Sequence, residues 1–355
     1  MPSLLPTMLR TAGPVLGLLL MVSASGAVAG PRPWIDPARA DFRDALEFAA
    51  AHPPITSVVI ATRDSILAEG HWRGGAPHDP TNVKSVSKSV LSALVGIALE
   101  RGDLDGLDTP IARWFDEHDD LFADPRRARI TLEDLLTMRS GLETTSFYNY
   151  GAWVAGRNWV RGQLRMPVEF EPGTVMRYST GASHLVSVIL ERATGSKPRD
   201  YAARHLFGPI GVDGVGWDRD PQGHDFGGNN LAMTPRQMVR FGQLHLSDGR
   251  WDGRRVLPAG WVQRAWRPRT RSHWNGYGYG YFWWHRTMGG TSVHYAWGHG
   301  GQRIFVLPEA GLVVAVASGL PDQGRSRQRV NRAIDRLPVD HVIEALSGPL
   351  RTSGP

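Results

Sequence analysis

Apolar residues recur at helical spacing in several segments of the chain. The segment Ser89–Leu99 (SVLSALVGIAL) is apolar on nearly every face, which predicts a buried helix. Other segments have the spacing of helices that bury a single face, and Thr131 and Thr234-Pro235 stand where helix caps are expected. These predicted helices cover Asp36–Ala51, Leu132–Met138, Gly181–Thr194 and Thr234–Leu246.

Short segments rich in β-branched and aromatic residues stand near both ends of the chain. Ser57–Thr62 and Ser65–His71 flank the turn Arg63-Asp64, which predicts a hairpin. The later strand-like segments are Gly280–Arg286, Ser292–Trp297, Arg303–Leu307 and Leu312–Ala317, and a final helix is predicted over Arg327–Leu346. The pattern predicts an α+β protein in which an antiparallel sheet, flanked by terminal helices, is built from both ends of the chain and a helical lobe is inserted.

The domain boundaries follow from the same pattern. A single two-lobed domain is expected over residues 30–346, with a tail at 347–355. Its α/β lobe takes about residues 30–80 and 275–346, and its helical lobe about 81–274. The substrate site is expected in the cleft between the two lobes.

The N-terminus has the layout of a bacterial signal peptide. Arg10 precedes the apolar run Val15–Val22, and Ala27-Val28-Ala29 supplies a cleavage site, so residues 1–29 are expected to direct export. The predicted location is periplasmic or secreted, with no stable membrane anchor after cleavage. An uncleaved anchor is the alternative, although the apolar run is short for a bilayer span.

Composition excludes several kinds of protein. Among 355 residues there is no cysteine, which rules out disulfides, thiolate metal sites and a lipid-bearing cysteine. The net charge is +6, but the arginines are scattered among acidic residues, so no nucleic-acid partner is expected. The acidic cluster Asp116–Asp120 does not have the spacing of a calcium loop, and no metal or cofactor is predicted.

Ser85 and Lys88 are the main candidates for chemistry. Their spacing of three, at the entrance to the buried helix, would place a hydroxyl and an amine on one face of its first turn. An amine within reach of a hydroxyl can activate it as a nucleophile. The chain has 40 basic residues, and just three of them, Lys84, Lys88 and Lys197, are lysine. Lysine can release its proton when desolvated and arginine cannot. A serine at a helix start also serves as an ordinary cap, which is the alternative.

Two later segments carry further polar candidates. Tyr178 stands immediately before the predicted helix Gly181–Thr194, where a side chain can reach a cleft; the alternative is a packed tyrosine with a bonded hydroxyl. His299 lies in the glycine-flanked segment Gly298–Gln302, at the start of a strand. Glycines there let another group approach the backbone closely.

These motifs occur in an order typical of one family. They are Ser85-Val86-Ser87-Lys88, Ile130–Gly141, Pro172-Gly173 followed by Tyr178-Ser179, Leu231–Gly242 and Gly298–Gln302. From about residue 55 to 320 the chain resembles the serine β-lactamase-like superfamily. The resemblance is to the branch of class C β-lactamases, D-Ala-D-Ala carboxypeptidases and esterases, and the chain is also similar to 6-aminohexanoate-dimer hydrolases. It implies a β-lactamase/transpeptidase-like fold.

The resemblance assigns a role to each residue. Ser85 would be acylated, and Lys88 and Tyr178 would form the base system. Gly301 lies within the third motif, and the backbone N–H groups of Ser85 and Gln302 would form an oxyanion hole.

Two positions depart from the family pattern. Thr180 replaces the asparagine of the second motif, and His299 replaces the lysine often found in the third. A neutral histidine attracts a substrate carboxylate less than lysine does. Both departures favour ester or uncharged amide substrates over β-lactams. About half of six aromatic residues are expected to wall the acyl pocket, and the rest to pack in the core: Trp274, Tyr277, Tyr279, Tyr281, Trp283 and Trp284.

The predicted function is that of a secreted serine hydrolase that forms an acyl-enzyme with a small-molecule carboxylic ester or small linear amide. Two alternatives stay open from the sequence. One is a D-amino-acid peptidase, carboxypeptidase or weak β-lactamase. The other is a non-catalytic binding member of the fold.

Overall fold

The computed structural model describes residues 34–319 and 325–347. The predicted signal peptide at 1–29 and all but the first residue of the predicted tail lie outside the described residues. In the described part of the chain no helix is long and apolar enough to cross a bilayer.

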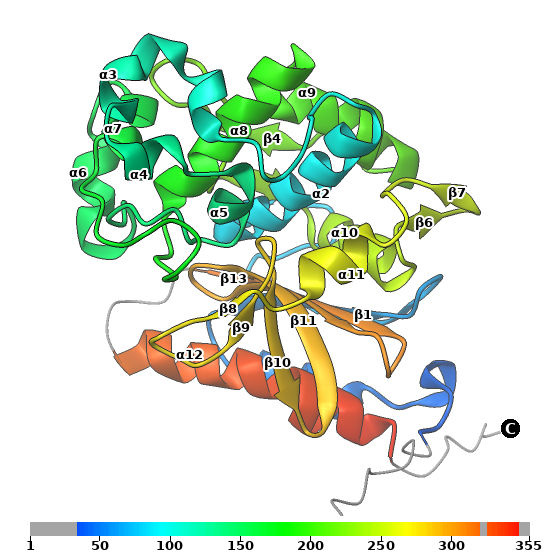
Figure 1. Cartoon of the computed structure of the whole chain (residues 1–355). Coiled ribbons are helices and arrows are strands. Elements are labelled where there is room, and N and C mark those ends of the chain that lie inside the picture. The colour runs from blue at the N-terminus through cyan, green and yellow to red at the C-terminus, as the bar shows by residue number, and fades with distance from the viewer. Residues whose placement is uncertain (1–33, 320–324, 348–355) are drawn as a thin grey trace, which may run out of the picture. The chain divides into compact units, whose positions relative to one another are not determined.

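The largest sheet is antiparallel and has eight strands in the order β2-β1-β13-β12-β11-β10-β9-β8 (Figure 1). The first hairpin is β1 (Ile55–Ala61) and β2 (Ile66–His71), and β1 also pairs with β13, so strands from the two ends of the chain lie side by side near the β2 edge of the sheet. The remaining strands are β8 (Thr270–Arg271), β9 (Gly278–Tyr279), β10 (Trp284–Met288), β11 (Thr291–Gly298), β12 (Gln302–Leu307) and β13 (Leu312–Ser318). The expected sheet built from both ends of the chain is therefore confirmed.

Helices cover both faces of this sheet, which explains why every residue of β12 is buried. Helix α10 (Pro235–Leu246) packs on β1, β12 and β13, although the sequence grouped these residues with the helical lobe. A Cβ added at Gly242 would lie 2.4 Å from Val313 Cγ1, so glycine permits this close packing. Figure 1 shows α12 (Arg325–Arg336) on the opposite face, and α1 (Arg43–Ala50) also contacts β1 and β2.

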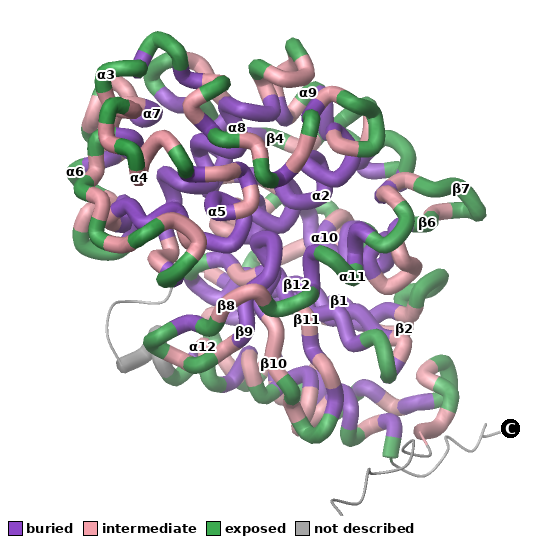
Figure 2. The backbone as a smooth tube through the Cα atoms, in the orientation of Figure 1, coloured by how far each residue is buried: buried purple, intermediate pink, exposed green. Residues whose placement is uncertain are grey.

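The helical part is organised around α2 (Ser87–Glu100) and α8 (Thr180–Thr194), which pack against each other. Both are buried along most of their length, as Figure 2 shows. The other helices of this part are α3 (Asp119–Phe122), α4 (Pro125–Ala128), α5 (Leu132–Leu136), α6 (Tyr150–Val154), α7 (Trp159–Leu164) and α9 (Pro198–Ala202). Helix α11 (Trp261–Trp266) stands closer to the sheet in Figure 1.

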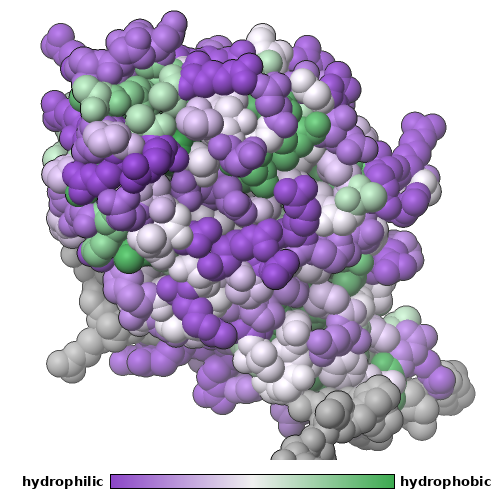
Figure 3. Space-filling view, viewed as in Figure 1, coloured by the Kyte–Doolittle hydropathy of each residue, from purple (hydrophilic) through white to green (hydrophobic). Residues whose placement is uncertain are grey.

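Two small sheets complete the described structure. Strands β3 (Thr81–Asn82), β5 (Leu231–Met233) and β4 (Gly216–Trp217) form one, and β6 (Arg250–Trp251) with β7 (Arg254–Arg255) forms the other. In Figure 3 the visible face is largely hydrophilic, with smaller apolar patches over the helical part. The α+β fold class predicted from the sequence is confirmed.

Three predicted boundaries were wrong. The helix expected from Asp36 begins at Arg43, after a separate 3₁₀ turn. The strand expected from Gly280 begins at Trp284, because Phe282 has a φ of +59° and donates its N–H to the carbonyls of Leu136 and Gly280. The final helix changes after Arg336 into a π-helix over Leu337–Ile343.

Candidate active site

Ser85 lies in a 3₁₀ turn (Lys84–Val86) directly before α2. It was expected in the first turn of the α-helix itself, and the structure places it two residues before that helix begins. Lys84 has a φ of +53°, a left-handed conformation that costs a non-glycine residue of order 1–3 kcal/mol. Its N–H donates to Asn82 Oδ1 at 2.9 Å, which helps to hold this backbone turn. The strained turn leaves the Ser85 side chain partly exposed at the head of a buried helix.

Lys88 is buried, with 1% of its surface exposed, and its Nζ lies 2.9 Å from Ser85 Oγ. Nζ also donates to the carbonyl oxygen of Gly228 at 2.5 Å. Burial away from water disfavours the ammonium form and lowers the pKa of Lys88 to about 7. Near neutral pH a large share of Lys88 is therefore the free amine, whose lone pair can accept the Ser85 proton.

Tyr178 is the third residue of this group. Its hydroxyl shares a hydrogen bond with Ser85, and Lys88 Nζ lies 5.1 Å from the centre of its ring. Burial of the hydroxyl raises the pKa of Tyr178 to about 12, although the bond to Ser85 opposes this rise. Between about pH 7 and pH 12, Tyr178 therefore keeps its proton while most of Lys88 has lost one. The sequence left open which of the two would be shifted toward neutrality, and the geometry favours Lys88.

The segment that carries Tyr178 is held by a neighbouring run of hydroxyl residues. Thr144 Oγ1 donates to the Tyr178 carbonyl at 2.6 Å. Ser146 Oγ accepts the Thr180 N–H at 2.8 Å and is hydrogen-bonded to Thr180 Oγ1 at 2.8 Å. The Thr180 side chain is thus buried and already paired, and its expected contact with a substrate stays a prediction. The sequence analysis missed Thr144 and Ser146, which stand more than 30 positions before their partners and belong to no recognisable motif.

The Gly228 carbonyl was also missed, because a backbone group has no signature in the sequence. Gly228 packs so tightly on α8 that an added Cβ would lie 2.4 Å from Ser183 Oγ and 2.7 Å from Thr180 Cγ2. The loop is tied to the Ser85 segment by the hydrogen bond from Asn82 Nδ2 to Asn230 Oδ1 at 2.9 Å. Glycine at this position therefore lets the carbonyl reach Lys88.

Gly228→Ala is expected to displace the carbonyl from Lys88 and to lower kcat by about 10²-fold, the loss typical of a misplacement of about 1 Å. Gly216→Ala is the matched control, because a Cβ there would meet Ala232 Cβ at an ordinary 3.6 Å. Steady-state kinetics and thermal unfolding of both variants would check this. Wild-type turnover in a folded Gly228→Ala protein would contradict the positioning role.

The glycine-rich third motif forms the tight connection between β11 and β12. The turn that carries Ser85 contacts both of these strands, and an added Cβ at Gly298 would lie 2.2 Å from the Val83 carbonyl oxygen. Gly298 is thus the glycine that permits close approach to the Ser85 segment. His299 is exposed in the connection itself, and its expected contact with a substrate stays a prediction.

The other two predicted residues of this motif, Gly301 and Gln302, contact α12 and β13. An added Cβ at Gly301 would meet Ile334 of α12 at 2.6 Å, so Gly301 serves packing against that helix. The Gln302 side-chain amide donates to the Ser318 carbonyl on β13 at 2.5 Å. Donation to an oxyanion by the Gln302 backbone N–H stays a prediction.

Aromatic rings surround Tyr178. Trp274, Tyr279 and Trp284 have ring centres 5.9–6.2 Å from that of Tyr178. The sequence did not identify Phe147, which is 64% exposed, has a φ of +53°, and lies 5.8 Å from Trp274. The other three predicted wall residues pack elsewhere: Tyr277 on Arg286, Tyr281 on Trp261 and Trp283 on Phe241. About half of the predicted wall therefore lies against Tyr178, and its contact with an acyl group stays a prediction.

Among the residues that the structure describes, no three histidine or acidic side chains lie together as a metal site requires. The chemistry of the cluster is that of a hydroxyl, an amine and a phenol. Such a group can transfer a proton from a nucleophile to a leaving group without any further component.

Comparison with known proteins identifies the family. Residues 54–337 match the Beta-lactamase family, and the chain belongs to it. The chain is 24% identical over 299 residues to the 6-aminohexanoate-dimer hydrolase of Paenarthrobacter ureafaciens, a match that covers 75% of this chain and 73% of that protein. The resemblance noted from the motifs is confirmed.

Solved structures share the fold. A Bacillus anthracis protein provisionally named a 6-aminohexanoate-dimer hydrolase has a TM-score of 0.71 at 18% identity, covering 82% of this chain and 81% of its own. A D-stereospecific amidohydrolase from Streptomyces has a TM-score of 0.64 at 18% identity, covering 85% and 98%. The β-lactamase/transpeptidase-like fold and the enzyme class, a β-lactamase-related serine hydrolase, are confirmed.

Proposed function

We propose that this protein is a serine hydrolase that forms an acyl-enzyme at Ser85 with a carboxylic ester or a small linear amide. The observation that carries the proposal is the contact between the proton donor, the Ser85 hydroxyl, and the proton acceptor, the Lys88 amine. A buried lysine with a pKa of about 7 lies 2.9 Å from the oxygen of a partly exposed serine. A structural lysine has no reason to be desolvated against a hydroxyl in this way.

Acylation uses all three side chains. Ser85 Oγ attacks the substrate carbonyl carbon while its proton passes to the free amine of Lys88. The ammonium that results donates to the Gly228 carbonyl, which offsets part of the cost of a buried charge. The proton then passes through the Tyr178 hydroxyl to the leaving alkoxide or amine as its bond to the carbonyl carbon breaks. The leaving group departs as an alcohol or amine, and Ser85 retains the acyl group as an ester.

Deacylation runs through the same groups. A water molecule gives a proton to the regenerated amine and attacks the acyl carbonyl, and the Ser85 oxygen leaves and takes the proton back. The negative charge that develops on the carbonyl oxygen in both steps calls for backbone donors. The N–H groups of Ser85 and Gln302 are the proposed donors, because the Ser85 turn contacts the strand that begins at Gln302.

Two observations support an uncharged substrate. Lys88 is partly neutral at pH 7 and lies too deep for an ion pair with a substrate carboxylate. The exposed rings of Phe147 and Trp274 beside Tyr178 offer apolar surface to one side of the scissile bond. The name of the Paenarthrobacter relative supports a small amide as the substrate class, but a dimer of an amino acid has charged ends, so it does not support the absence of charge.

The test is a parallel assay of the purified chain with p-nitrophenyl acetate and butyrate, the linear 6-aminohexanoate dimer, nitrocefin and a D-Ala-D-Ala peptide. Hydrolysis of the esters or of the linear dimer, with little hydrolysis of nitrocefin, is expected. No turnover of any substrate, together with no labelling by a fluorophosphonate probe, would leave the non-catalytic binding protein as the better description.

A second candidate function is hydrolysis of D-amino-acid amides. It is supported by the structural likeness to the Streptomyces amidohydrolase, whose name states D-stereospecificity. Comparison of D- and L-alanine p-nitroanilides separates the two candidates. Faster hydrolysis of the D-alanine anilide than of both its L-isomer and the simple esters would favour this second function.

The rate is expected to depend on pH through Lys88. Its pKa is lowered to about 7, so kcat/KM should rise about tenfold per pH unit below 7 and become level above it. Tyr178, with a pKa near 12, should not limit the rate at accessible alkaline pH. Initial rates with p-nitrophenyl butyrate between pH 5 and 9.5, corrected for spontaneous hydrolysis, measure the profile. A rate that still rises about tenfold per pH unit up to pH 9.5 would instead indicate an unshifted lysine or a tyrosinate as the base.

The N-terminal layout supports export as a proposal. We infer that the signal peptide is cleaved after Ala29 and that the mature protein is delivered to the periplasm or the medium. Intact mass measurement of the protein recovered from the periplasmic fraction of an expressing bacterium would locate the mature N-terminus. Recovery of a full-length chain in the membrane fraction would favour the uncleaved anchor.

A further inference from the structure

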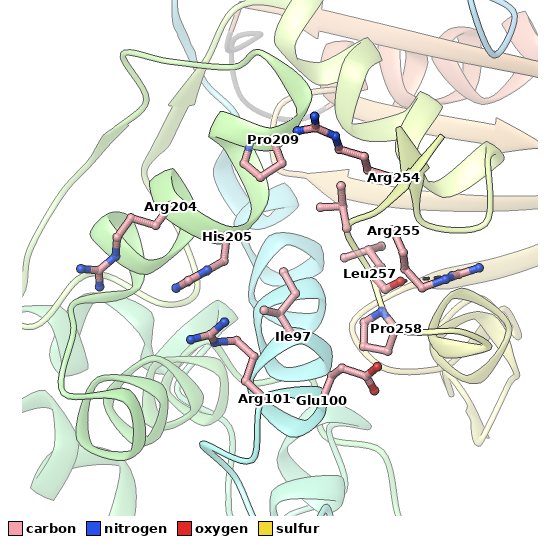
Figure 4. Close-up of a pocket in the computed structure, with 11 residues that line it drawn as sticks. Ile97, Glu100, Arg101, Arg204, His205, Pro209, Arg254, Arg255, Leu257 and Pro258 are labelled. Atoms are coloured by element: carbon pink, nitrogen blue, oxygen red, sulfur yellow. Dashed lines mark hydrogen bonds between the residues drawn. The ribbon is translucent and has the colours of Figure 1, made fainter. Parts of the chain in front are cut away.

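A cavity of about 500 Å³ lies beside the C-terminal end of α2, whereas Ser85 precedes the N-terminal end of the same helix (Figure 4). Its wall comes from the end of α2, the π-helix Ala203–Phe207 that follows α9, Pro209, and the segment that begins in β7. None of its lining residues belongs to the group around Ser85. The size falls within the range of small-ligand sites.

The wall is rich in positive charge. Four arginines and His205 line the cavity, against a single carboxylate, that of Glu100. Within the described residues neither Arg204 nor Arg254 forms an ion pair; Arg204 donates to the Ser196 hydroxyl at 2.5 Å. Arg101 and Arg255 each have one carboxylate partner, Asp103 and Asp248. The two arginines without such a partner leave positive charge that an anion placed in the cavity would offset.

Arg101 and His205 point toward each other across the cavity in Figure 4. Arg101 Nε lies 3.4 Å from Asp103 Oδ2, but this carboxylate is shared, because it also accepts the Tyr201 hydroxyl at 2.7 Å. Partial burial and the charges of Arg101 and Arg204 lower the pKa of His205, which favours its neutral form. A neutral ring still offers one N–H donor to an anion that Arg101 attracts.

The π-helix is what brings this part of the wall into place. Arg204 and His205 both lie within Ala203–Phe207, where the backbone leaves regular α-helical geometry. Such turns are rare and are found frequently at functional sites. The rest of the wall is apolar: Ile97 is 5% exposed, and Pro209 and Pro258 lie at opposite sides of it in Figure 4.

We infer that this cavity is a binding site for a small anion with an apolar body, such as an aryl or alkyl phosphate or carboxylate. The anionic group would be held by Arg101 and His205, with Arg204 and Arg254 adding attraction from the edges. The apolar body would lie on Ile97 and the two prolines. Such a site is independent of the hydrolase chemistry proposed for Ser85.

Isothermal titration of the full chain with phenyl phosphate tests the site, with benzoate to compare the two kinds of anion and phenol as the uncharged analogue. Binding of phenyl phosphate or benzoate is expected, with at least tenfold weaker binding of phenol. Arg101→Gln should weaken anion binding at least tenfold, whereas Glu100→Gln should strengthen it, because the one opposing charge is removed. Ester turnover should be unchanged in both variants.

Arg250→Gln is the matched control, because Arg250 lies on the same hairpin in β6 but not in the cavity wall. It should bind phenyl phosphate as the wild type does. An Arg250→Gln protein that loses as much affinity as Arg101→Gln would mean attraction by overall charge and would overturn the site. Unchanged affinity in both Arg101→Gln and Glu100→Gln would overturn it as well.

Discussion

Ser85→Ala is expected to abolish labelling by a fluorophosphonate probe and to lower ester turnover by on the order of 10⁶-fold, the loss seen when a hydrolase loses its nucleophile. In the proposed mechanism the hydroxyl of Ser85 is the group that holds the acyl moiety. Alanine removes it without disturbing the turn, because Ser85 Oγ makes one long contact of 3.4 Å to the Gly228 carbonyl besides its bonds to Lys88 and Tyr178.

Ser92→Ala is the matched control for this experiment. Ser92 lies on the same helix, is fully buried, and its hydroxyl has no hydrogen-bond partner among the described residues. Its removal should leave labelling and turnover intact and should not reduce stability, since an unpaired buried hydroxyl costs free energy. Equal labelling of the Ser85→Ala protein and the wild type would mean that another residue is the nucleophile.

The helices that frame the site could be read from the sequence because local and tertiary preferences agree there. Helix α10 begins after Thr234 with Pro235 in its first turn, and α8 ends at Gly195 in the left-handed conformation that favours glycine. The apolar pattern of Ser89–Leu99 is nearly unbroken because α2 is enclosed on all sides. At these places the sequence alone indicates where a helix begins or ends.

The chemistry was predictable where it rests on side-chain type and spacing, as with Ser85 and Lys88. It was not predictable where it depends on backbone groups or on distant contacts. The Gly228 carbonyl lies against Lys88, which is 140 positions away in the sequence, because Gly228 packs on α8. The strained φ of Lys84 follows from the turn that presents Ser85.

The same limit explains the strand that was predicted too long. Gly280–Arg286 has the aromatic content of a strand, but tertiary contacts override that preference. The Ser89 hydroxyl of α2 donates to the Phe282 carbonyl at 2.7 Å, and the Phe282 N–H donates to the Leu136 carbonyl. These bonds fix a left-handed residue that no local preference favours, and they link the sheet to the helices on which the site is built.

Lys88→Arg is expected to lower kcat/KM by on the order of 10³-fold, the usual share of a general base. Arginine keeps the positive charge but cannot release its proton, so it cannot accept one from Ser85. Fluorophosphonate labelling should slow in parallel, since the same proton must leave. Lys197→Arg is the matched control, because Lys197 is half-buried near Glu191 and belongs to no proposed step. Full activity in Lys88→Arg would refute the role of Lys88 in proton transfer.

Because a buried guanidinium can prevent folding, Lys88→Met supplies the second variant. It should be inactive yet more stable than the wild type, since methionine removes a buried amine. The Lys88 pKa is lowered from 10.5 to about 7 in the folded state, so the unfolded state binds more protons between those values. Wild-type stability should therefore rise with pH across this window, and the advantage of Lys88→Met should shrink from a few kcal/mol at pH 6 toward pH 9. Denaturant unfolding at the two pH values measures this, and an advantage that does not change with pH would mean that Lys88 is not desolvated as the structure indicates.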